Sequence, residues 1–110
     1  MTTSVLADVR DEIVKSFDVG ERAELRLENI NGEVEIQGWS KNEIKVVAVI
    51  TADDQQDRDR IMVDIDHNSR GVSIETRYKK SSRWGKNHSG TVDYIVHVPV
   101  QARLSSIDLV

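Results

Sequence analysis

The 110-residue chain contains no cysteine and only one proline. Without cysteine it cannot build a disulfide scaffold, a thiolate zinc site or a thiol nucleophile. The absence of cysteine does not indicate the cellular compartment, because many secreted proteins also lack disulfides. No stretch of the chain approaches the roughly 18 apolar residues that a membrane span requires. The sequence therefore excludes a transmembrane helix and all thiol chemistry.

The N-terminus lacks both the basic region and the apolar core of a complete signal peptide. Val5-Leu6-Ala7 before Asp8 nevertheless places small residues at the two positions that signal peptidase reads. Two interpretations stay open. The segment is either the tail of a removed signal peptide or a short N-terminus that matches by chance.

Leucine and alanine are scarce, with five of each, whereas valine and isoleucine together number 25 (15 and 10). β-Branched side chains lose rotamer freedom in a helix and fit well on a pleated sheet. The composition therefore disfavours a helical bundle. The length allows a single domain with a small core.

Apolar and polar residues alternate with a period of two through most of the chain. The stretch 44–50 is apolar on both faces, which predicts a central or doubly covered strand. Residues 53–60 contain no apolar side chain and are expected to form a solvated loop or one exposed helical turn. The alternation predicts eight short strands, at 13–19, 23–28, 33–37, 44–50, 61–65, 72–78, 92–98 and 104–109. This pattern is typical of a β-sandwich or a β-solenoid.

One short repeat accompanies the strands. Leu27-Glu28-Asn29-Ile30 aligns with Ile107-Asp108-Leu109-Val110, each with an apolar residue, an acid, a free position and a β-branched residue. In the first copy Asn31-Gly32 follows, which is a strong tight-turn signal. The second copy ends at Val110. We therefore expect a domain that is truncated there.

The segment LENINGEVEIQGWSKNEIKVVA resembles the opening of a bacterial adhesin-like family, a domain-of-unknown-function group of β-solenoid proteins in cell-envelope contexts. IETRYKK and VDYIVHVP continue the resemblance, which covers roughly residues 12–110. It implies an all-β fold of short antiparallel strands that begin a β-solenoid or β-roll, with a small β-sandwich as the alternative. It also implies an extracytoplasmic location. From the chain itself we expect a flexible segment 1–10 and one domain over 11–110. The family has no agreed catalytic residues to carry over.

The segment from Arg77 to Gly90 contains five cations and no acid, although residues 1–66 sum to −8 (8 basic, 16 acidic). The candidate ligand-binding residues are Lys79, Lys80, Arg83, Trp84 and Lys86. Such a loop could bind an anionic glycan, a lipid headgroup or an envelope protein. Nucleic acid is disfavoured, because the chain is acidic overall. The alternative is a solvated loop whose Trp84 folds back on the sheets.

The remaining polar clusters give weaker evidence for a functional site. Six aspartates between Asp53 and Asp66 could bind Ca²⁺, but they lack EF-hand spacing and we favour a solvated connector. The three histidines are expected to be surface residues rather than zinc ligands. No nucleophile elbow or phosphate-binding glycine loop occurs. Trp39, at a strand end, is expected to pack over the end of the sheet.

These observations predict a non-catalytic, envelope-associated binding or structural module that displays loops from a rigid sheet stack and needs no metal or cofactor. An envelope-stress sensor or regulatory scaffold is the alternative, binding cationic peptides or a protein partner through the acidic segment. A hydrolase of surface polymers ranks last. An uncapped strand edge would also favour edge-strand self-association.

Overall fold

A computed structural model describes residues 9–79 and 90–109. These residues form eight strands and one helical turn, so the predicted all-β class is confirmed. The first strand begins at Val9, two residues before the expected start of the domain. The elements are β1 (Val9–Asp18), β2 (Glu24–Asn29), β3 (Val34–Trp39), β4 (Glu43–Ala52), α1 (Gln55–Arg58), β5 (Ile61–Asn68), β6 (Gly71–Tyr78), β7 (Gly90–Pro99) and β8 (Arg103–Leu109).

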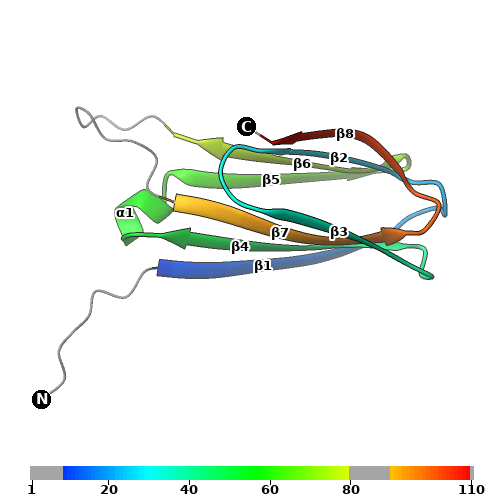
Figure 1. The fold of residues 1–110 in the computed structure, drawn as a ribbon, viewed down its shortest axis with the longest axis horizontal. Helices are drawn as coiled ribbons and strands as arrows, with labels where there is room; N and C mark the ends of the chain where they lie inside the picture. Colours follow the sequence, from blue (N-terminus) through cyan, green and yellow to red (C-terminus); the bar gives the residue numbers. More distant parts are fainter. Residues whose placement is uncertain (1–8, 80–89, 110) are drawn as a thin grey trace, which may run out of the picture.

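The described strands lie in two four-stranded sheets that face each other (Figure 1). Sheet A has the order β1-β4-β7-β3, and sheet B has the order β5-β6-β2-β8. Strand β4 is central in sheet A, as its two apolar faces predicted. The expectation of purely antiparallel strands is wrong. β3 runs parallel to β7, and β2 runs parallel to both β6 and β8, so both sheets are mixed.

One core lies between the two sheets. Alternate residues of β4 and β7 point inward from sheet A, and those of β2 and β6 point inward from sheet B. The buried hydrophobic side chains form a single cluster. Its members are Ala23, Leu25, Leu27, Ile44, Val46, Ala48, Ile50, Ala52, Ile61, Val72, Ile74, Val92, Tyr94, Val96 and Val98. The period-two pattern thus produced the core, because each strand buries one face.

Two buried hydrogen bonds cross the core from one sheet to the other. The hydroxyls of Thr76 on β6 and Tyr94 on β7 are 2.6 Å apart. Asn29 on β2 donates from Nδ2 to the carbonyl oxygen of Val92 on β7, at 2.9 Å. A buried polar group is stabilising only when it has a partner. These side chains therefore favour one relative placement of the sheets.

The sequence repeat corresponds to an observed strand pair. β2 and β8 run side by side in parallel, with Leu27 opposite Ile107, Glu28 opposite Asp108 and Asn29 opposite Leu109. These are the same matches that the sequence alignment makes. The Asn31-Gly32 turn does not form a hairpin, because β2 and β3 belong to different sheets. It carries the chain from sheet B to sheet A.

The hairpin between β5 and β6 depends on a close backbone approach. Asn68 accepts hydrogen bonds through Oδ1 from the backbone N–H groups of Arg70 and Gly71. Gly71 has φ +154°, and a Cβ there would overlap the carbonyl oxygen of Glu24 on β2. Only glycine fits this position without displacing β2. β5 extends to Asn68, beyond the predicted strand end at residue 65, so His67 lies on this strand.

Candidate functional site

The predicted basic segment falls largely outside the described residues. Lys79 is described: its side chain is exposed, and its backbone N–H donates to the carbonyl oxygen of Arg60 at 2.8 Å. Lys80, Arg83, Trp84 and Lys86 lie in the part of the chain that the structure does not describe. The structure therefore shows where this connection leaves and rejoins the sheets.

The two ends of the β6–β7 connection are joined by hydrogen bonds to one carbonyl oxygen. The hydroxyl of Tyr78, the last residue of β6, donates to the carbonyl oxygen of Gly90, the first residue of β7, at 3.1 Å. Asn31 donates from Nδ2 to the same oxygen at 3.0 Å. A Cβ on Gly90 would lie 2.5 Å from Cδ1 of Ile61 and 3.0 Å from the carbonyl oxygen of Thr51, so a larger residue would displace the Ile61 side chain. We call these contacts of Tyr78, Asn31 and Gly90 the base of the connection.

The tyrosine of the base sits in a desolvated environment. Burial raises the pKa of Tyr78 above the ordinary value for tyrosine. The phenol therefore keeps its hydrogen to donate to Gly90 up to a higher pH than an ordinary tyrosine would.

The acidic segment forms the helical turn that the sequence offered as one of two alternatives. Its first part forms α1, and Asp54 caps this turn by accepting from the backbone N–H of Asp57 at 2.7 Å. The expectation of a solvated segment is wrong at Asp57, which is 3% exposed and forms an ion pair with Arg60. Arg58 pairs with Asp11 of β1 through Nε and Oδ2 at 2.5 Å. These charges hold α1 against the sheets.

A row of four carboxylates crosses the outer face of sheet B, and sequence reasoning missed it. Asp64 on β5 lies opposite Glu75 on β6, Glu75 opposite Glu28 on β2, and Glu28 opposite Asp108 on β8. We call these four residues the carboxylate row. Like charges directly opposite one another destabilise a sheet. The repulsion within the row therefore destabilises sheet B, although the fold does not require acids at these positions.

Arg77 relieves one end of the carboxylate row. Its guanidinium lies 3.2 Å from Oδ2 of Asp64 and 3.0 Å from Oε1 of Glu75. The hydrogen bond to Glu75 is the main reason that the pKa of Arg77 is raised above its ordinary value. The other end borders a groove of about 280 Å³ that is lined by Glu28, Glu75, Asp108 and Arg26, among others. Negative charge is thus concentrated toward β2 and β8.

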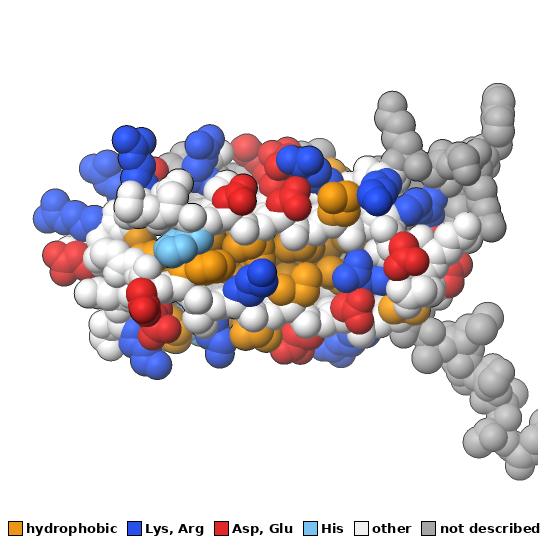
Figure 2. Space-filling model, turned by 180° about the vertical axis from the view of Figure 1, so that it is seen from behind, with side chains coloured by type: hydrophobic (Ala, Val, Ile, Leu, Met, Phe, Trp, Pro, Cys, Tyr) orange, Lys and Arg blue, Asp and Glu red, His pale blue; other side chains and the backbone are white. Residues whose placement is uncertain are grey.

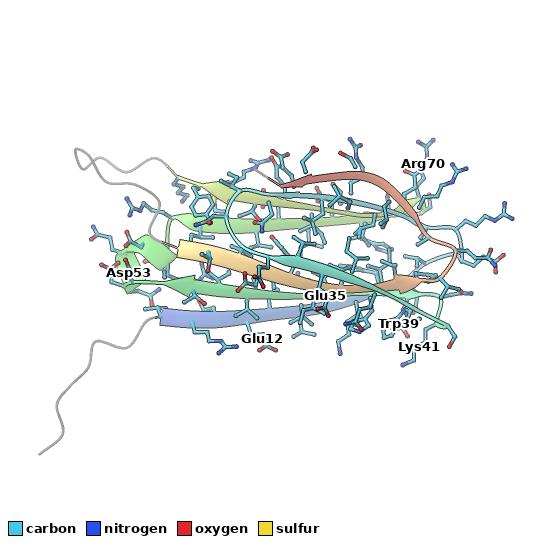
Figure 3. The ribbon with its side chains drawn as sticks, in the orientation of Figure 1. Glu12, Glu35, Trp39, Lys41, Asp53 and Arg70 are labelled. Atoms are coloured by element: carbon cyan, nitrogen blue, oxygen red, sulfur yellow. The ribbon has the colours of Figure 1, made fainter. Side chains whose placement is uncertain are left out.

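Trp39 forms an aromatic corner at the end of sheet A, together with Lys41 and His97 (Figure 3). Its indole N–H donates to the carbonyl oxygen of Glu43 at 2.7 Å, and its ring centroid is 4.9 Å from that of His97. Nζ of Lys41 lies 5.0 Å from the ring centroid. The predicted packing of Trp39 over the sheet end agrees with this geometry, although the ring is only half-buried.

The two described histidines lie apart and serve aromatic contacts. His67 on β5 stacks on Phe17 of β1, with ring centroids 4.7 Å apart, and His97 faces Trp39. His88 lies outside the described residues. Within residues 9–79 and 90–109, no three His, Asp or Glu side chains come together as a metal site.

Comparison with protein-family models, with curated proteins and with solved structures finds no match to this chain. Among the helices of the described residues, none has the length and apolar character needed to cross a membrane.

Proposed function

We propose that the chain is a non-catalytic, adhesin-like binding or structural module of the cell envelope, which displays the connection 79–90 from a two-sheet frame. The resemblance of residues 31–39 to adhesin-like envelope proteins supports the family and the extracytoplasmic location. The frame is the described part of the module, and the cations of the connection are its binding residues. Anionic glycans and lipid headgroups are the ligands that such residues fit.

The base of the connection is the observation that carries this proposal. Tyr78 and Gly90 bring the two ends of the segment together, and Lys79 is fixed to Arg60 through its backbone. A loop with fixed ends loses less entropy on binding than a loop with free ends. Four cations in such a loop can act together on one polyanion, because their attachment points do not move apart.

The parallel pairs support the solenoid reading of the fold. β6, β2 and β8 run parallel in sheet B, and β3 and β7 run parallel in sheet A. Stacked parallel rungs that pass between two sheets are the building principle of a solenoid. The frame therefore fits either the start of a β-roll or a small sandwich, and the loop display works equally in both.

The test is cosedimentation of the full chain with vesicles that contain an anionic phospholipid, and with an anionic polysaccharide. Replacing Lys79, Lys80, Arg83 and Lys86 with glutamine should abolish binding. A matched control replaces four exposed cations elsewhere, Arg22, Lys41, Arg70 and Arg103, and should retain binding despite the same change in net charge. Equal loss in both variants would mean that only net charge matters.

The carboxylate row favours a second candidate, a scaffold that binds cationic peptides. Four acids in one row, with Arg77 at one end and Arg26 in the groove at the other, give a net negative surface of the right sign. Binding of an oligolysine peptide that is lost when Glu28, Glu75 and Asp108 become amides would support this function. Because the two candidates need ligands of opposite charge, one binding series separates them.

A further inference from the structure

The edge strand β1 carries two charges on its core-facing side. Its odd-numbered residues lie opposite the buried residues of β4, and Asp11 and Lys15 are two of them. Both side chains are exposed. Charges on the core side of an edge strand oppose pairing with another edge unless the incoming strand brings the opposite charge. What faces these two residues therefore decides whether β1 can pair.

Of these two charges, only that of Asp11 forms an ion pair within the described part of the chain. Arg58 binds Oδ2 of Asp11, which leaves the other carboxylate oxygen to a second cation. Lys15 makes no ion pair with any residue in the described part of the chain. It lines a groove of about 510 Å³ with Asp64 and Asp66 of β5, both beyond ion-pairing distance. Lys15 is thus a cation without a fixed partner beside an open strand edge.

The order of residues along β1 is self-complementary. If two copies of β1 run antiparallel with Ile13 opposite Ile13, Asp11 of each copy faces Lys15 of the other. On the same side, Val9 faces Phe17 of the second copy. All core-facing pairs then match, apolar with apolar and acid with base. In this register both charged residues of the unpaired edge, Asp11 and Lys15, face a residue of opposite charge.

Neighbouring registers lack this match. Centring the pair on Val14 places Ile13 opposite Lys15 and Asp11 opposite Phe17. Centring it on Glu12 places Asp11 opposite Ile13 and Val9 opposite Lys15. Each leaves a charge against an apolar side chain on the core side. The sequence of β1 therefore specifies one register rather than edge pairing in general.

The surroundings of β1 also favour a covered edge. On the side where β1 and β5 form the edges of the two sheets, a band of hydrophobic side chains runs along the surface between charged groups (Figure 2). Ile13, Phe17, Val63 and Ile65 are only partly buried against the core there. Val14, on the outer face, is 51% exposed. A strand added beside β1 would remove part of this surface from water.

We propose that β1 pairs antiparallel with β1 of a second copy of this chain about Ile13, which joins the two A sheets into one eight-stranded sheet. This inference is independent of the proposed loop display, because β1 takes no part in the base of the connection. A single strand pair buries less area than a standard interface, so the dimer is weak and forms at high protein concentration.

The first experiment measures self-association of the full chain by sedimentation over a concentration series. K15D places two carboxylates opposite each other at both ends of the pair and should weaken the dimer by about 100-fold, because like charges then face each other twice. D11K should have a similar effect. The double variant D11K/K15D restores opposite charges in the same register and should dimerise again. Circular dichroism checks that each variant is folded.

The matched control is E12K, which makes the same charge reversal on the same strand. Glu12 lies on the outer face, where it would be opposite Val14 of the second copy. Its reversal should leave the dimer within about threefold of the unaltered chain. Equal weakening by E12K and D11K would overturn the proposed register.

The second experiment reads the register directly. The chain has no cysteine, so a single introduced cysteine reports one contact only. Ile13→Cys should form a disulfide dimer under mild oxidation, because opposed side chains in an antiparallel pair are within bridging distance. Val14→Cys, placed opposite Glu12, should crosslink far less. A chain that is monomeric at all concentrations, a dimer unaffected by K15D, or preferential crosslinking through Val14→Cys would each overturn the proposal.

Discussion

The hydrogen bond between Thr76 and Tyr94 offers the sharpest test of how the two sheets meet. The two hydroxyls are 2.6 Å apart, and the residues are 2% and 1% exposed, so neither hydroxyl can turn to water. Tyr94→Phe or Thr76→Val alone leaves one buried hydroxyl without a partner. Each single change should lower the free energy of unfolding by about 1–3 kcal/mol.

The double variant should cost little more than either single variant, because it removes both hydroxyls and nearly preserves the volume. The expected coupling energy is about 1–2 kcal/mol. Urea unfolding followed by circular dichroism measures all four proteins, and equal m-values would show that the transition stays the same. Additive single effects, with no coupling, would refute the claim that β6 and β7 face each other across the core.

Three further outcomes are expected. Burial raises the pKa of Tyr94 to about 12, above the ordinary 10.0, so the free energy of unfolding should fall by about 2 kcal/mol as the pH rises from about 10 to 12. Tyr94→Phe should remove most of this loss in alkaline urea titrations. Gly71→Ala should destabilise the chain by at least about 2 kcal/mol in urea, because its Cβ meets Glu24. Trp39→Ala should lower stability by about 1–3 kcal/mol, less than a fully buried aromatic.

The strands and the core were predictable from the sequence because burial has a period of two. Leu25 and Leu27 alternate with charged residues, and both are buried on β2. The sequence repeat aligns Leu27 with Ile107, and these two residues lie opposite each other in the β2–β8 pair. Local pattern therefore fixes which face of a strand is buried.

Strand pairing was not predictable, because it depends on contacts between distant segments. The Asn31-Gly32 turn looks like a hairpin, yet it connects two sheets, and β2 finds its partners in β6 and β8. Nothing in the alternation distinguishes parallel from antiparallel neighbours. The carboxylate row stayed hidden for the same reason, since Asp64 and Glu28 become neighbours only through Glu75.

The burial of several polar residues was also not predictable from the sequence pattern. Asp57 lies in a segment without apolar residues, so the pattern indicated solvent exposure, but the pairing with Arg60 allows its burial. Asn29 and Thr76 occupy core-facing positions that a hydrophobic pattern alone does not single out. For Asn29 and Thr76 the partner that makes burial favourable comes from a distant segment of the chain.

The salt dependence of binding to anionic vesicles tests the central claim most directly. If the base presents the cations of the connection 79–90 to a polyanion, the affinity of the full chain falls steeply with salt. The slope then flattens when Lys79, Lys80, Arg83 and Lys86 are replaced with glutamine, and it persists when Arg22, Lys41, Arg70 and Arg103 are replaced. An affinity that does not respond to salt, or a slope that changes equally in both variants, would contradict the account.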